Sequence, residues 1–505
     1  MTKIITRFPP SPTGFLHIGG LRTALYNYLL AKKNKGKFLL RIEDTDRKRY
    51  VEGAIEDIID TLNFFKLKFD NEPVFQSQRL NVYKKAAQKL IDSGLAYYCF
   101  CTPERLEELH QKQRNLKKPT MYDKKCRDLT EQQVAEQLKN EVPYVIRLKM
   151  PENETIEFDD LIRGHVKFAT DLLDDQILIK SDGFPTYHLA SVVDDAEIGV
   201  THVMRGEEWL SSTPKHIILY KFLNLQAPQF AHVPLLLNPD RSKLSKRVGD
   251  VAVKDYLEKG YLPEALLNFV LFLGWNPGDE REIFSLDEMV KEFSLEKINK
   301  SGAVFNVEKL DWINGQYIRR KSLEELANFA VYFYIKEGIL KPIFRSAEVK
   351  PELTGYMGQN IEEDLVVKKS GEIISFDKFK MIIATEKERV KTLTELPEAT
   401  KFFFQEPEYE KEMLVWKKAD MEKTKQALDL IYNLLKEIDE KDFTADMLEK
   451  KVMEFIKANQ LDTGTNLWPM RVALTGRQKS PGPFEVAAVL GKEKVLNRLK
   501  KAMEY

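Results

Sequence analysis

The sequence predicts an α/β chain whose parallel-sheet domain is interrupted by an inserted segment and followed by an all-helical last third. Three observations predict this: a strand, helix and strand follow one another at the N-terminus, the middle is polar and irregular, and helical periodicity dominates from about residue 318 onward. At 505 residues the chain is too long for one ordinary domain, and we expect about three to five.

The N-terminal segment carries the sheet signal. Residues 4–8 form a short apolar run, a turn rich in proline and glycine follows, and residues 38–42 form a second run. Between them Leu21, Leu25 and Leu29 recur at helical spacing up to Gly36, a typical helix stop. This order predicts a βαβ unit with parallel strands and a right-handed crossover.

The middle of the chain mixes polar stretches with short apolar runs. Residues 144–148 and 176–180 have the pattern of strands. Residues 189–193 and 202–205 resume the short apolar runs typical of a buried sheet. We therefore interpret the middle as an insertion between two halves of one domain.

The last third has the pattern of packed helices. Ser322 and Glu325 form a capping box before an apolar helix that should stop near Gly338. Further apolar stripes at helical spacing predict an all-helical region; they comprise Leu428, Ile431, Leu435 and Ile438, then Leu448, Val452 and Ile456, then Phe484, Ala487, Val495 and Leu499.

Composition limits the class of protein. The 78 basic and 78 acidic residues cancel, which disfavours a uniformly basic nucleic-acid binder but allows local basic patches. No stretch reaches the roughly 18 apolar residues that span a membrane, and the N-terminus lacks a secretory pattern. With only three cysteines, we expect a cytoplasmic chain whose thiols are free, catalytic or metal-bound rather than paired.

Two motifs carry the chemistry. Residues 9–20, PPSPTGFLHIGG, lie between the predicted strand and helix, where small residues and free backbone N–H groups let a phosphate approach. His17 there can donate a hydrogen bond to a phosphate oxygen. Residues 243–247, KLSKR, place two lysines in a loop that could neutralise a polyphosphate.

Together these motifs resemble the HIGH and KMSKS elements of the class I aminoacyl-tRNA synthetases. Residues 41–46 (RIEDTD), 181–190 (SDGFPTYHLA) and 205–210 (RGEEWL) further resemble the bacterial-type glutamyl members. Gly20 in place of the last histidine of HIGH favours the glutamyl members over the glutaminyl ones. The predicted helical ending favours them too, because the glutaminyl relatives end in β-barrels.

The resemblance implies a fold and a reaction. The expected parts are a Rossmann-like catalytic domain (1–98 and 189–254, the latter with the KLSKR loop), an inserted acceptor-stem-binding domain (99–188), a helical stem-contact domain (255–320) and an all-helical anticodon-binding region (321–505). Such enzymes activate glutamate with ATP and Mg²⁺, then transfer the glutamyl group to the terminal adenosine of the glutamate tRNA. The family also implies a monomer.

The resemblance also assigns site residues. It places cationic, hydroxyl and acidic groups around glutamate, and arginine suits a carboxylate because its planar fork binds both oxygens; the glutamate positions are Arg7, Ser11, Glu43, Tyr187, Ser191 and Arg205. Asparagine is found in some members where Ser191 stands. The ATP phosphates face His17, Gly19, Lys243 and Lys246, and the adenosine faces Glu208, Trp209 and Leu236.

The cysteines match a metal pattern of some bacterial members. Cys99, Cys101 and Cys126 have the spacing of a zinc site whose last ligand is histidine, but Asp128 stands at that position. A carboxylate can complete a tetrahedral zinc site; the other reading is a decayed site with free thiols. Farther on, Arg389 lies near the position that tests the third anticodon base.

Other functions stay open at this point. The enzyme could also charge the glutamine tRNA, since a few anticodon contacts decide that. A short relative that modifies a tRNA base lacks the C-terminal region, and a nucleotidylyltransferase of the same fold would not explain it. An RNA-binding paralogue without activity is disfavoured because His17, Lys246 and Arg205 are retained.

Overall fold

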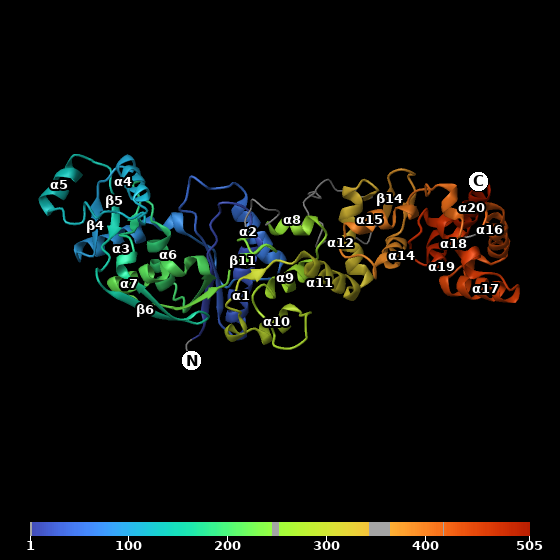
Figure 1. Cartoon of the computed structure of the whole chain (residues 1–505), viewed down its shortest axis with the longest axis horizontal. Helices are drawn as coiled ribbons and strands as arrows, with labels where there is room; N and C mark the ends of the chain where they lie inside the picture. The colour runs from blue at the N-terminus through green and yellow to red at the C-terminus, as the bar shows by residue number, and fades with distance from the viewer. Residues whose placement is uncertain (1–2, 245–251, 343–363, 418) are drawn as a thin grey trace. The chain divides into compact units, whose positions relative to one another are not determined.

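The computed structural model describes residues 3–244, 252–342, 364–417 and 419–505. The chain divides into two compact units, residues 1–255 with 266–307 and residues 256–265 with 308–505. Figure 1 labels their helices and strands. None of the described helices is both long and apolar enough to cross a membrane.

The first unit begins with the predicted βαβ arrangement. Strand β1 (Ile5–Phe8), helix α1 (Ile18–Lys33) and strand β2 (Lys37–Ile42) follow in order. The two strands are parallel, with Ile5 opposite Lys37, and β3 (Val74–Phe75) extends the sheet beyond β2. Only glycine fits at position 36, because a Cβ there would collide with the carbonyl of Ile4. The predicted order of strand, helix and strand and the parallel pairing are therefore confirmed.

A second sheet joins the inserted segment to the later part of the unit. Its order is β7 (Gly164–Ala169), β6 (Thr155–Asp160), β10 (Gln229–Val233) and β9 (His202–Gly206). Strands β6, β10 and β9 are parallel, whereas β7 runs antiparallel to β6. The predicted strand at 202–205 is confirmed, and a strand from the insertion pairs directly with the second half of the domain.

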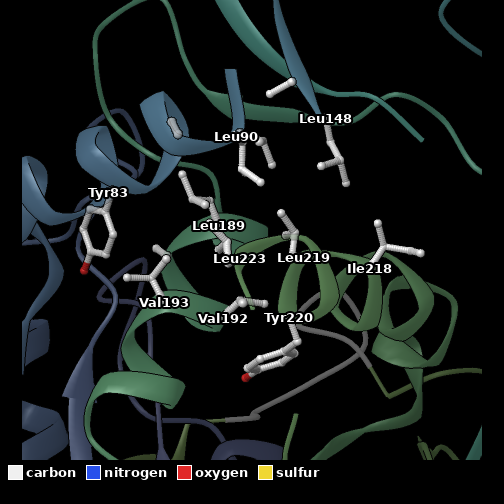
Figure 2. Packing of buried hydrophobic residues seen from close by; sticks show 14 of the residues in the cluster. Tyr83, Leu90, Leu148, Leu189, Val192, Val193, Ile218, Leu219, Tyr220 and Leu223 are labelled. Atoms are coloured by element: carbon white, nitrogen blue, oxygen red, sulfur yellow. The ribbon is translucent and has the colours of Figure 1, made fainter. Parts of the chain in front are cut away.

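The predicted strand at 189–193 is wrong, because these residues belong to helix α6 (Tyr187–Glu197). The helix is enclosed on most sides, so its apolar residues run consecutively and hide the helical period. In Figure 2 its side chains face those of α3 (Leu80–Asp92) and α7 (Thr213–Leu223) in one core. The residues shown there include Leu90, Leu189, Val192, Val193, Leu219 and Tyr220.

The rest of the insertion forms a small antiparallel sheet. It consists of β4 (Ala96–Cys99), β5 (Val145–Leu148) and β8 (Ile177–Ile179), which confirms the strands predicted at 144–148 and 176–180. The remaining elements up to residue 307 are α2 (Ala54–Phe64), α4 (Pro103–Asn115), α5 (Glu131–Lys139), β11 (Leu236–Leu237), α8 (Val253–Glu258), α9 (Pro263–Leu271), α10 (Leu286–Glu292) and β12 (Ala303–Val304).

The second unit is largely helical, as predicted. The capping box of Ser322 and Glu325 is present, and the helix that it starts ends at Lys336, two residues before Gly338. The helices are α11 (Val307–Arg320), α12 (Leu323–Lys336), α14 (Phe376–Glu386), α15 (Glu395–Ala399), α16 (Met421–Lys436), α17 (Ala445–Ala458), α18 (Thr463–Thr475), α19 (Pro483–Leu490) and α20 (Lys492–Met503).

The second unit is not entirely helical, which corrects the prediction. Strands β13 (Leu340–Pro342), β14 (Leu365–Val367) and β15 (Ile373–Ile374) form a small antiparallel sheet. Each strand is only two or three residues long, too short for a recognisable alternating pattern, and burial of Leu340, Leu365 and Val367 stabilises it instead. The finer division into five segments stays a prediction.

Candidate active site

A cavity of about 480 Å³ opens where β1 ends and α1 begins. It brings together most of the residues that the sequence assigned to substrates: Arg7, Ser11, His17, Gly19, Glu43, Tyr187, Arg205, Glu208, Trp209, Leu236 and Lys243. Ser191 does not line it, and Lys246 lies outside the described residues. Residues from widely separated parts of the sequence therefore converge on one site, at the carboxyl end of a parallel strand.

The start of α1 forms one side of the cavity. His17 is the N-cap, and its Nδ1 accepts a hydrogen bond of 3.0 Å from the backbone N–H of Gly20. Accepting at Nδ1 places the proton of a neutral imidazole on Nε2. A Cβ on Gly19 would stand only 3.1 Å from the His17 ring, so glycine leaves room for this ring position. This end of the cavity combines helix N–H groups with a histidine donor, which suits phosphate.

Arg7, near the end of β1, contributes a buried cation to the lining of the cavity. Its side chain is completely buried, and its Nε donates to both carboxylate oxygens of Asp195 at 3.1 and 3.2 Å. Arg7 lines the cavity, and its two terminal nitrogens are buried and have no acceptor among the described residues. Buried donors are rarely left unpaired in native proteins. These two nitrogens can therefore pair with an anion.

A buried network holds this region, and two of its members, Arg41 and Asp195, had no role in the sequence prediction. Arg41 donates to Asp195 at 2.5 Å and to Glu43 at 3.0 Å. Burial raises the pKa of Glu43 to about 7, although Arg41 partly opposes the shift. The sequence contained one signal for this network. Arg41 and Glu43 stand two residues apart at the end of a strand, and alternate residues of a strand lie on the same face. Asp195 gave no sequence signal of its own.

Ser191 belongs to this supporting network and not to the cavity wall. It is buried, and its hydroxyl lies 3.5 Å from both the Arg41 guanidinium and the Asp195 carboxylate. Its predicted contact with a substrate has no support in the lining of the cavity.

Arg205, on β9, lines the cavity with its N–H groups already engaged. Its Nε and two terminal nitrogens donate to His232, Tyr187, His216, Thr213 and the carbonyl of Trp209 at distances of 2.8–3.4 Å. These are five acceptors, and a guanidinium has five N–H donors, so each N–H of Arg205 has an acceptor within the protein. Arg205 therefore acts on the cavity mainly through the Tyr187 hydroxyl. The ring of Tyr187 is tilted against that of Trp209, with the ring centroids 4.3 Å apart.

The three cysteines meet in the insertion. The ligand atoms of Cys99, Cys101 and Cys126 all lie within 4.8 Å of one another, and the three thiols are free of disulfides. The hydroxyl of Tyr122 lies 3.3 Å from the sulfur of Cys99 and 3.5 Å from that of Cys101. The predicted fourth ligand, Asp128, is exposed, and its carboxylate is not part of this group.

A second cavity, of about 700 Å³, lies within the helical unit. Arg389 lines it with a half-exposed side chain, and the rings of Trp416 and Trp468, tilted against each other with centroids 4.6 Å apart, lie on its wall. Further lining residues are Arg471, Arg477 and Lys479. Aromatic faces next to cations are the usual groups that bind unpaired bases and their phosphates.

The βαβ unit, the helix N-terminus that suits phosphate and the arginines of the cavity are the features to compare with known classes of protein. A family model described as "tRNA synthetases class I (E and Q), catalytic domain" matches residues 3–312, and an "Anticodon binding domain" model matches residues 347–503. The chain belongs to the class I tRNA synthetases of the glutamate and glutamine type.

Relatives of full length agree with this assignment. The chain is 41% identical to the glutamate–tRNA ligase of Alkaliphilus metalliredigens across 100% of both chains. It is 43% identical to that of Chlorobaculum parvum across 99% of this chain and 98% of the relative. A crystal structure of a glutamate tRNA ligase from Elizabethkingia meningosepticum, in complex with its amino acid, superimposes with a TM-score of 0.85 at 34% identity, covering 99% of both chains.

Proposed function

We propose that this chain is a glutamate–tRNA ligase, which uses ATP to convert glutamate into glutamyl-adenylate with release of pyrophosphate and then passes the glutamyl group to a tRNA. The observation that carries the proposal is that Arg7 and Glu43 line one cavity, and that the two buried terminal nitrogens of Arg7 have no acceptor among the described residues. Glutamate has two carboxylates and one ammonium group. A site with oriented cationic donors and a nearby carboxylate complements that pattern of charges.

The groups around the cavity suit the parts of the substrates. The guanidinium of Arg7 and the hydroxyl of Tyr187, which is polarised by Arg205, would receive carboxylate oxygens, while Glu43 would receive the ammonium group. His17, Gly19 and Lys243 would face the phosphates of ATP, and Lys246 would join them. Mg²⁺ enters as part of the nucleotide substrate, since it is bound mainly through phosphate oxygens.

The first step is an exchange at the α-phosphorus of ATP. A carboxylate oxygen of glutamate forms a bond to this phosphorus, the bond to the bridging oxygen breaks, and pyrophosphate leaves. The protein needs no covalent role here, because positioning the two reactants and stabilising the charge on the phosphates supply the rate enhancement.

The second step transfers the glutamyl group. The 2′-hydroxyl of the terminal adenosine of the tRNA attacks the activated carbonyl carbon and loses its proton, and AMP leaves. In the helical unit, the cavity with Arg389, Trp416 and Trp468 would accept anticodon bases, the aromatic faces by stacking and the arginine by a base edge or phosphate.

The cysteine cluster would hold one structural zinc ion. In a tetrahedral site with Zn–S bonds of about 2.3 Å and Zn–O bonds of about 2.0 Å, two sulfurs lie about 3.8 Å apart and a sulfur and an oxygen about 3.5 Å apart. The Cys101 and Cys126 sulfurs are 3.6 Å apart, and Tyr122 lies 3.3 and 3.5 Å from two sulfurs. This geometry favours Tyr122 over Asp128 as the fourth ligand.

Metal analysis of purified variants tests the zinc site. We expect about one zinc per chain in the wild type and in Asp128→Asn, and a loss of zinc in Cys126→Ser. Tyr122→Phe should bind zinc more weakly in a chelator competition, because one ligand is removed. Weakened binding in Asp128→Asn with unchanged binding in Tyr122→Phe would instead assign the fourth position to Asp128.

The decisive test of the activity is charging of labelled glutamate onto two purified transcripts, the glutamate tRNA and the glutamine tRNA, with ATP and Mg²⁺. Charging of the first alone identifies a discriminating enzyme. Charging of both identifies a non-discriminating enzyme, and Arg389→Gln would then show whether the helical cavity sets the preference. Charging of neither by folded protein would refute the proposal.

A further inference from the structure

Two buried side chains, Asp160 and His232, are linked to Arg205 by hydrogen bonds and do not themselves line the cavity. Asp160 ends β6, His232 lies on β10, and Arg205 lies on β9. His232 and Arg205 are register partners on adjacent parallel strands, so their side chains emerge on the same face of the sheet. All three side chains are nearly or completely buried, at 3%, 0% and 4% exposure.

The hydrogen bonds that link these side chains permit only one placement of the imidazole proton. The Nε of Arg205 lies 3.1 Å from Nε2 of His232, and a guanidinium can only donate, so Nε2 must accept. The proton of the neutral ring is therefore on Nδ1, which donates to Oδ2 of Asp160 at 2.6 Å. Burial lowers the pKa of His232 and keeps the ring neutral, although Asp160 partly opposes the shift.

Two further histidines, His216 and His188, support the other side of the Arg205 guanidinium. A terminal nitrogen of Arg205 lies 3.2 Å from Nδ1 of His216, so this nitrogen accepts and Nε2 of His216 carries the proton. That Nε2 lies 3.1 Å from Nδ1 of His188, which accepts in turn. The same terminal nitrogen of Arg205 donates to the hydroxyl of Tyr187 at 2.8 Å.

We infer that Asp160 and His232 are positioning residues, which orient Arg205 so that the Tyr187 hydroxyl must donate its own proton into the cavity. Because Tyr187 accepts from Arg205, its O–H remains to meet a substrate oxygen. A donor at this point favours a carboxylate oxygen over the NH₂ group of a carboxamide. The inference rests on the proposed function, because it assigns a role within the glutamate pocket.

Asp160→Asn is the sharpest perturbation, since it keeps the size of the side chain. Oδ1 of Asp160 accepts three backbone N–H groups, those of Ile162, Arg163 and His232, at 3.0, 2.8 and 3.2 Å. The asparagine oxygen must therefore stay there, and its NH₂ group must face Nδ1 of His232. The His232 ring then carries its proton on Nε2. This N–H and the Nε–H of Arg205 are both donors, so the hydrogen bond between them is lost. An isosteric Asp→Asn change behind a histidine acts through the wrong tautomer in the same way in serine proteases.

The expected result is a change in glutamate binding more than in turnover. Loss of one hydrogen bond of a charged group predicts a rise in KM for glutamate of about 10- to 100-fold, with kcat less affected because ground state and transition state lose the same contact. KM for ATP should change less than about threefold. Asp70→Asn is the matched control, because Asp70 pairs with Lys32 away from the cavity and its loss should leave KM for glutamate unchanged.

A double-mutant cycle separates positioning from general damage. With the native Arg205 present, we expect Asp160→Asn to raise KM for glutamate strongly. In an Arg205→Lys background the same substitution should raise it less than about threefold, because the effects of coupled residues are not additive. Equal effects in both backgrounds would overturn the inference. If Arg205→Lys alone leaves KM for glutamate unchanged, the assignment of the glutamate pocket fails instead.

A second variant covers the case in which Asp160→Asn does not fold. Thr213→Val removes a hydroxyl that lies 2.9 Å from a terminal nitrogen of Arg205 and 3.1 Å from Nε2 of His232, and it leaves Asp160 intact. We expect a smaller rise in KM for glutamate, about 3- to 10-fold, which again disappears in the Arg205→Lys background. A rise that persists in that background would count against the positioning role.

Discussion

Arg7→Lys is the substitution that tests the glutamate pocket most directly. Arg7 uses Nε to bind Asp195 and leaves two terminal nitrogens, buried and without an acceptor among the described residues, for the ligand. Lysine keeps the charge, but its three N–H donors share one nitrogen, so it cannot reproduce the planar fork that holds Asp195 through Nε and directs two other nitrogens to a ligand. The substitution therefore removes about one charge-assisted hydrogen bond and the bidentate geometry.

The expected loss of transition-state stabilisation follows from the number of hydrogen bonds that the substitution removes. A hydrogen bond of a charged group contributes about 1.5–3 kcal/mol, so we expect a loss of about 2–3 kcal/mol of transition-state stabilisation. This corresponds to a decrease in kcat/KM for glutamate of about 30- to 150-fold. The assay is the initial rate of glutamate charging onto tRNA at varied glutamate, with ATP saturating.

Arg79→Lys provides a matched control. Arg79 binds Asp194, the residue next to Asp195 on α6, with a distance of 3.0 Å from Nε to the carboxylate, but it does not line the cavity. The same substitution there should leave kcat/KM for glutamate within about threefold of wild type. Ligand binding gives a second readout, since glutamate should stabilise the wild type against urea more than it stabilises Arg7→Lys. Unchanged glutamate kinetics in a folded Arg7→Lys protein would refute the assignment of Arg7.

Two further predictions concern the ends of the same cavity. Because burial raises the pKa of Glu43 to about 7, and only its ionised form attracts an ammonium group, KM for glutamate should rise about tenfold from pH 8 to pH 6; Glu43→Gln should have a higher KM without this pH dependence, and an identical pH profile in the variant would contradict the role. Gly19→Ala should raise KM for ATP about 2- to 10-fold, because the new Cβ would stand 3.1 Å from the His17 ring and displace it. Since alanine also favours the helix, unfolding in urea should show equal or greater stability, and reduced stability would show that the effect is not local.

The secondary structure was predictable wherever a local pattern was strong. The βαβ unit at residues 4–42, the capping box at Ser322 and Glu325, and the helical stripes of the last third are each determined by neighbouring residues. The prediction was wrong at residues 189–193, where a helix buried on most sides shows no period. It was incomplete at β13, β14 and β15, which are too short to show one.

The sequence by itself determined the class of chemistry, because motif residues such as His17, Glu43 and Arg205 must be particular residue types to do their work. Only the tertiary structure decided how each donor is used. It left the terminal nitrogens of Arg7 for a ligand, occupied those of Arg205, and moved Ser191 behind the cavity wall. Hydrogen-bond partners such as Asp195 and His232 come from distant strands and helices, and a one-dimensional pattern does not record which distant residues a fold brings within 3 Å.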